Sequence, residues 1–209
     1  MEDTLLEVRD LQVEFSTKMG IVRVLDKVNL KVDPRQTVGI IGLGNIGSRV
    51  ASRMAGFEAR LLGTDPCWPE ALAAKYGIER RELNELLAES DIVCVHCPLD
   101  ETTAGFIGKA ELALMKPSAL LVNMARGGIV DEDALYEALR GKVISGAIID
   151  AYSQEPLTAS PLFSLDNVIL SPHAGAFTTD ALNAMSRMSV DQLFQYVDGA
   201  TPDNLVTAE

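Results

Sequence analysis

The sequence predicts an α/β fold built on a parallel sheet, and three observations support this class. From Thr37 onward, short apolar runs alternate with amphipathic stretches, which is typical of a doubly wound sheet with helices on both faces. Three glycines spaced G-x-G-x-x-G, at Gly42, Gly44 and Gly47, follow the first apolar run. The second apolar run ends at an acidic residue, Asp65. This order of elements predicts the first unit of a dinucleotide-binding sheet of the Rossmann type.

Composition and charge exclude several classes of protein. The chain has 209 residues, 47% of them hydrophobic, and a net charge of −12. Such an acidic surface does not suit a nucleic-acid partner or an anionic membrane, and no run is long enough to span a bilayer. The acidic start, Met1-Glu2-Asp3, does not resemble a signal peptide. With an odd count of three cysteines, we expect a reduced, cytoplasmic setting.

Residues 1–36 differ in texture from the rest, and we expect them to form a separate β extension. Short alternating segments indicate an antiparallel hairpin or meander, with a turn at 16–20. The segments LLEVRDLQVEF and VRVLDKVNLKV resemble the first strands of an ABC-transporter ATPase. That family continues into a P-loop, but Ser48 stands here where the phosphate-binding lysine is required. We therefore expect no ATPase activity.

The remaining elements follow in regular alternation, and we assign 37–204 to one domain and 205–209 to a tail. The expected strands span six apolar runs: 37–42, 60–65, 91–96, 119–123, 145–149 and 167–170. The expected helices are 45–55, 69–76, 82–89, 109–115, 131–140 and 178–198. The last helix is rich in methionine, and we expect its apolar face to pack into the core.

Each glycine of the motif has its own expected role. Gly42 allows a sharp turn off the strand, Gly44 leaves room for a diphosphate, and Gly47 lets the helix pack on the strand. Free N–H groups near Asn45 and Ile46 would then face the phosphates. The alternative is a glycine-rich turn that binds nothing.

Asp65 lies 18 residues beyond Gly47, at the end of the next strand. A carboxylate in this place can accept hydrogen bonds from both ribose hydroxyls, and it repels a 2′-phosphate. The sequence therefore predicts NAD rather than NADP.

Three further residue types fit hydride transfer to or from an alcohol. His173 can take and return the hydroxyl proton, Glu155 can orient that imidazole, and Arg126 can hold a carboxylate. These positions are far apart in sequence. From residue types alone, a capping histidine, a solvated glutamate and a surface arginine therefore remain open as alternatives.

From Thr37 to about Asn204 the chain resembles the coenzyme domain of the NAD-dependent D-2-hydroxyacid dehydrogenases, phosphoglycerate dehydrogenases among them. The motifs that carry the resemblance are GLGNIG, HCPL, VNMARGGIVDEDAL and SPHAGA, together with Asp65 and the pair Glu155-Pro156. The resemblance implies a homodimer and a small 2-hydroxy or 2-keto acid as substrate. It assigns His173 as the acid/base, Glu155 as its partner and Arg126 as the substrate anchor.

The resemblance also implies a cofactor site, with Asp150 near the nicotinamide amide. Its expected members are Gly42, Gly44, Asn45, Ile46, Gly47, Asp65, Cys97, Pro98, Thr103, Met124, Ala125, Arg126, Asp150, His173, Gly175 and Ala176. Met124 and Ala151-Tyr152 are mild departures from the family pattern.

The large departure lies before the glycine motif, where the family carries a substrate domain. We expect that domain to be absent here, so NAD binding is a firmer expectation than turnover. The alternative function is a catalytically silent NAD(H)-binding or dimerisation module.

A cysteine pair and a second histidine could also be taken for functional residues. We expect neither a redox nor a metal role for the Cys94-x-x-Cys97 pair, and we expect His96 to be a packed residue beneath the cofactor.

Overall fold

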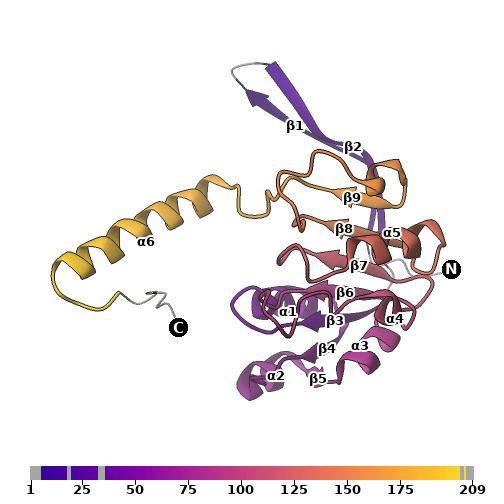
Figure 1. The fold of residues 1–209 in the computed structure, drawn as a ribbon, viewed down its shortest axis with the longest axis horizontal. Coiled ribbons are helices and arrows are strands. Elements are labelled where there is room, and N and C mark those ends of the chain that lie inside the picture. The colour runs from indigo at the N-terminus through magenta and orange to yellow at the C-terminus, as the bar shows by residue number, and fades with distance from the viewer. Residues whose placement is uncertain (1–5, 18–19, 33–35, 203–204, 206–209) are drawn as a thin grey trace.

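A computed structural model describes residues 6–17, 20–32, 36–202 and 205. Figure 1 shows a central sheet with helices on both faces, a two-stranded hairpin beside it, and a long final helix that projects away from the sheet. The predicted α/β class with an N-terminal β extension is confirmed.

The central sheet has seven strands, all parallel, in the order β5-β4-β3-β6-β7-β8-β9. The strands are β3 (Thr37–Ile41), β4 (Arg60–Thr64), β5 (Ile78–Arg80), β6 (Ile92–Val95), β7 (Leu120–Asn123), β8 (Gly146–Ile149) and β9 (Val168–Leu170). The direction of winding reverses between β3 and β6. Ligands of open α/β sheets bind outside the carboxyl ends of the strands at such a switch point.

The prediction of six strands was wrong by one. β5 pairs with β4 through Leu61↔Ile78 and the two positions that follow, and it forms one edge of the sheet. With three residues and one buried apolar side chain, Ile78, it carries no periodic signal that would separate it from a loop.

The helices cover the two faces of the sheet in two groups. Their bounds are α1 (Gly47–Ala55), α2 (Glu70–Tyr76), α3 (Leu83–Glu89), α4 (Lys109–Leu112), α5 (Glu132–Arg140) and α6 (Thr179–Val197), with a 3-10 helix η1 (Pro161–Ser164) before β9. α1 and α2 contact each other on one face, and α3, α4 and α5 form a connected row on the other.

Two apolar clusters form the core, one on each face. Successive residues of a strand point to opposite faces, so Ile40 packs with the α1 and α2 side while Ile41 joins the cluster under α3 to α5. Leu61 and Leu62 of β4 divide in the same way. Because both faces are covered, the strands read as continuous apolar runs rather than as alternating ones.

The N-terminal extension consists of two long strands, β1 (Leu6–Thr17) and β2 (Gly20–Val32). They pair antiparallel with each other and with no strand of the central sheet. Of the turn expected at 16–20, residues 16–17 belong to β1 and residue 20 begins β2, whereas residues 18–19 lie outside the described chain. The domain boundaries after residues 36 and 204 stay predictions.

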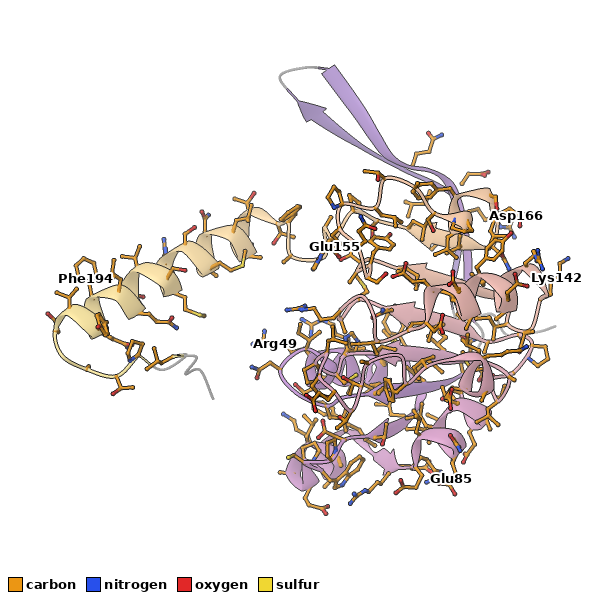
Figure 2. The ribbon with its side chains drawn as sticks, in the orientation of Figure 1. Arg49, Glu85, Lys142, Glu155, Asp166 and Phe194 are labelled. Atoms are coloured by element: carbon orange, nitrogen blue, oxygen red, sulfur yellow. The ribbon has the colours of Figure 1, made fainter. Side chains whose placement is uncertain are left out.

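The expectation that α6 packs into the core was wrong. None of its described residues is buried, and Leu193, Phe194 and Tyr196 are each more than 60% exposed. Figure 2 shows Phe194 far out on the projecting helix. The helix still begins at a regular cap, where Thr178 Oγ1 accepts a hydrogen bond from Ala181 N at 3.1 Å. The capping residue and the helical pattern of the segment itself thus favour a helix here, but no buried apolar face fixes where the helix lies.

Candidate active site

The glycine motif forms the turn between β3 and α1, with the backbone that the three expected roles require. Gly42 has φ +88°, and a Cβ there would stand 2.6 Å from Cys97 N. A Cβ at Gly47 would overlap the carbonyl of Gly42, so the start of α1 packs directly on the turn. A Cβ at Gly44 would meet nothing within 4 Å. Gly42 and Gly47 are therefore needed for the fold of the turn, whereas Gly44 borders open space.

Asp65 follows β4 and lies against this turn. Its Oδ2 accepts a hydrogen bond from Leu43 N at 2.7 Å, and its Oδ1 accepts one from Cys67 N at 2.7 Å. The carboxylate is therefore held in one orientation beside the glycine turn. Each oxygen keeps a second lone pair for a ligand hydroxyl.

Two hollows meet at the switch point between β3 and β6. The first hollow, of about 370 Å³, is lined by the predicted residues Gly42, Gly44, Asp65, Cys97, Pro98 and Thr103. The second hollow, of about 530 Å³, is lined by the predicted residues Asn45, Ile46, Cys97, Pro98, Met124, Ala125 and Arg126. In the described chain, the backbone N–H groups of Asn45 and Ile46 donate to no other residue. The residues present therefore fit a dinucleotide, with open space and N–H donors for a diphosphate between a carboxylate and a cation.

The loops after β8 and β9 meet because these strands are parallel neighbours, with Ile149 paired to Leu170. Asp150, 3% exposed, accepts hydrogen bonds from Ser171 Oγ at 2.6 Å, Ala174 N at 2.8 Å and Gly175 N at 2.9 Å. Burial by itself raises the pKa of Asp150, but these hydrogen bonds outweigh it and lower that pKa below its usual value. Asp150 thus fixes the loop that carries the predicted histidine.

His173 and Glu155 form the predicted pair. His173 Nδ1 lies 2.8 Å from Glu155 Oε2 and 2.9 Å from Oε1, and Tyr152 N donates to Oε1 at 3.0 Å. The His173 ring first, and then the Tyr152 N–H, lower the pKa of Glu155. His173 has φ +52°, in the left-handed region that residues other than glycine adopt uncommonly. With Nδ1 occupied, Nε2 is the nitrogen available for proton exchange.

Figure 2 shows Glu155 on the side of the sheet that faces α6, and Lys142 and Asp166 on the opposite side. A third hollow of about 530 Å³ adjoins the pair and is lined by Glu155 and His173 with mostly apolar neighbours, among them Leu157 and Phe163. The pair is open to solvent, since the side chains of His173 and Glu155 are 45% and 36% exposed.

Arg126 belongs to the second hollow and does not line the third. Its Nη1 donates to Ala125 O at 2.8 Å. Met124 lines the second hollow, and its Cε lies 3.3 Å from the point where a Cβ on Gly175, in the loop of His173, would stand. Four predicted residues line none of the three hollows: Gly47, Asp150, Gly175, which donates to Asp150, and Ala176.

Three supporting residues were missed from the sequence. Asn123, 2% exposed, accepts from Ala125 N at 3.2 Å and donates to Arg126 O at 3.1 Å, so it shapes the turn that carries Arg126. The Tyr152 hydroxyl lies 2.9 Å from both Ile149 O and Ser171 O, and Ser171 bonds Asp150. Asn123 ends β7 and Ser171 directly follows β9, which is a weak signal in the sequence, and Tyr152, three residues beyond β8, had none.

The two cysteines of the C-x-x-C pair lie in different apolar clusters. Cys94 packs in the cluster under α1 and α2, whereas Cys97 packs against the opposite cluster. Burial raises the pKa of both thiols to about 11, so neither is a thiolate near neutral pH. Within the described ranges, no three side chains of His, Cys, Asp or Glu are grouped to hold a metal ion. Nor does any helix there have the length and apolar character needed to cross a bilayer.

Comparisons with known proteins agree with this geometry. The family model of the D-isomer specific 2-hydroxyacid dehydrogenase NAD binding domain matches residues 22–175. The chain is 41% identical over 172 residues to D-3-phosphoglycerate dehydrogenase of Methanocaldococcus jannaschii, covering 82% of this chain and 33% of that one. It is 42% identical over 175 residues to glyoxylate reductase of Korarchaeum cryptofilum, covering 83% of this chain and 53% of that one.

A solved structure, D-lactate dehydrogenase with NAD+ from Lactobacillus jensenii, superposes with a TM-score of 0.76 at 31% identity, covering 83% of this chain and 56% of that one. The chain thus spans between a third and somewhat more than half of the length of these relatives. The match begins at residue 22, inside the N-terminal segment whose sequence resembles an ABC-transporter ATPase. The chain belongs to the D-isomer specific 2-hydroxyacid dehydrogenase family and carries its NAD-binding domain.

Proposed function

We propose that this chain binds NAD(H) across the first and second hollows and exchanges hydride with a small 2-hydroxy or 2-keto acid beside His173. The observation that carries the proposal is the His173–Glu155 pair, with Nδ1 2.8 Å from a carboxylate oxygen, on a loop fixed by Asp150. The names of the relatives, a phosphoglycerate dehydrogenase and a glyoxylate reductase, support the substrate class.

We assign each residue a role within this proposal. Glu155 holds the Nδ1–H of His173 and stabilises the imidazolium, so that Nε2 can take a proton from the substrate hydroxyl and return it in reverse. Arg126 binds the substrate carboxylate by charge-assisted hydrogen bonds. Asp65 accepts from the adenosine ribose, which favours NAD over NADP. When bound, the nicotinamide ring supplies the hydride acceptor or donor.

A second candidate function is an NAD(H)-binding module without turnover. The exposure of the His173–Glu155 pair favours it, because hydride transfer works best where water is excluded.

The exposed apolar side chains of α6 support a role in assembly, and we propose a homodimer. The free cysteines support a reducing, cytoplasmic setting.

The experiment combines NADH fluorescence titration with turnover of a panel of 2-hydroxy and 2-keto acids. Wild type and His173→Ala should both bind NADH, and only wild type should turn over. Asp166→Asn, an exposed change at the opposite end of the sheet, is the matched control and should behave as wild type. Binding without turnover in all three proteins would support the silent module. The absence of NADH binding would contradict both functions.

A further inference from the structure

His96 lies where the first and second hollows meet, and the roles proposed so far leave it unused. It directly follows β6 and is a lining residue of both hollows. Its backbone N–H donates to Ile41 O at 2.7 Å, which ties it to the end of β3. Because β3 and β6 are the two strands of the switch point, the imidazole is fixed beside the glycine turn.

The two ring nitrogens of His96 have different surroundings. Nδ1 is enclosed and has no hydrogen-bond partner among the residues that the structure describes. Nε2 is not enclosed, and no described residue bonds it. Burial lowers the pKa of the imidazole, so the ring is neutral near pH 7. Its single proton belongs on Nε2, since an N–H at Nδ1 would be buried without an acceptor.

A dinucleotide that fills both hollows has to pass this ring. Among the residues that the structure describes, only His96, Cys97 and Pro98 line both hollows, and of these three His96 alone has a side-chain N–H. Asp65 marks the end of the first hollow that suits a ribose, and Arg126 lies in the second. The part of the ligand that faces His96 is therefore its middle, which offers acceptors and no strong donor except ribose hydroxyls.

We propose that His96 is a positioning residue for the dinucleotide, whose Nε2–H donates a hydrogen bond to an oxygen of the diphosphate or of the ribose on its nicotinamide side. The inference rests on the proposed NAD(H) binding. It differs from the expectation that His96 only packs beneath the cofactor, because a packing ring requires shape alone, whereas a positioning ring requires the donor at Nε2.

Two variants separate the donor from the shape. His96→Gln keeps an N–H donor close to the place of Nε2, whereas His96→Leu keeps comparable apolar bulk and has no donor. We expect Kd for NADH to change by less than about 2-fold in His96→Gln and to rise about 5- to 20-fold in His96→Leu, as for one lost hydrogen bond. Thermal melting without ligand serves as the folding control.

Fragments of the ligand locate the bond. AMP should bind both variants as it binds wild type, because it does not extend past the first hollow. If the affinity of His96→Leu is first reduced with ADP, the acceptor lies on the diphosphate. If it is first reduced with ADP-ribose, the acceptor lies on the second ribose. A loss already present in full with AMP would overturn the proposal.

Nitrogen-15 NMR tests the tautomer in wild type and does not depend on the folding of a variant. The chain has only two histidines, so His96→Gln assigns the signals by removing one set. We expect a neutral ring protonated at Nε2, whose Nε2 signal shifts with NADH and not with AMP. A ring protonated at Nδ1, or equal NADH affinity of the Gln and Leu variants, would overturn the proposal. Wild type that fails to bind NADH would instead reject the proposed function, and this inference with it.

Discussion

Replacing Gly44 with alanine should separate cofactor binding from folding. A Cβ at this position meets nothing within 4 Å, and the backbone is not in the left-handed region, so the free energy of unfolding should change by less than about 0.5 kcal/mol. The same methyl group would occupy space that the diphosphate needs. Overpacking costs about 1–3 kcal/mol, so Kd for NADH should rise roughly 5- to 150-fold.

Gly42→Ala is the matched control, two residues earlier in the same turn. Here a left-handed backbone at φ +88° costs about 1–2 kcal/mol for an alanine, and the Cβ would stand 2.6 Å from Cys97 N. With about 1–3 kcal/mol for the overlap, the loss of stability should reach about 2–5 kcal/mol. Urea unfolding followed by circular dichroism, with NADH fluorescence titration, measures both quantities. A Gly44→Ala protein that binds NADH as wild type does, or that loses as much stability as Gly42→Ala, would refute the reasoning.

Four further predictions concern acidic and capping side chains. Asp65→Ala should weaken NADH binding about 10- to 100-fold and NADPH binding much less, since only NADH uses the carboxylate, and equal losses in fluorescence titrations would contradict this. Asp131 caps α5 by accepting from Ala134 N at 2.9 Å, so Asp131→Ala should cost about 1 kcal/mol in urea unfolding. Thr178→Ala removes the same kind of bond from α6 and should change global stability little, because no described residue of α6 is buried. Asp150 has a lowered pKa in the folded state, so its contribution is complete above its unfolded pKa of about 3.9 and is lost as pH falls through the lower folded value. Asp150→Asn should accordingly flatten the acid limb of melting temperature against pH, and an unchanged slope would count against that role.

The parallel sheet could be predicted because its physics is local and periodic. Buried strands such as 92–95 read as apolar runs, and the glycine spacing marks where the first strand turns into a helix. β5 was not predicted because a strand of three residues is too short to show a periodic pattern of apolar side chains. The placement of α6 escaped prediction for a different reason, since an apolar helical pattern shows that a surface can be buried without showing what buries it.

The sequence named candidate residues for the site but not the residues that hold them in place. Glu155 and His173 could be named from a motif, and the pairing of β8 with β9 explains why they meet. Asn123 and Tyr152 were missed because their roles depend on hydrogen bonds between loops that become neighbours only in the folded chain. The resemblance placed Asp150 near the nicotinamide. The structure shows that this carboxylate also fixes the loop of His173.

The most direct test of the central claim is isothermal titration calorimetry of NADH into the wild-type chain. The two hollows, the open Gly44 and the fixed Asp65 predict saturable binding of one NADH per chain, with Kd well below about 1 mM. A titration that shows no saturable uptake with NADH at several times about 1 mM would contradict the account.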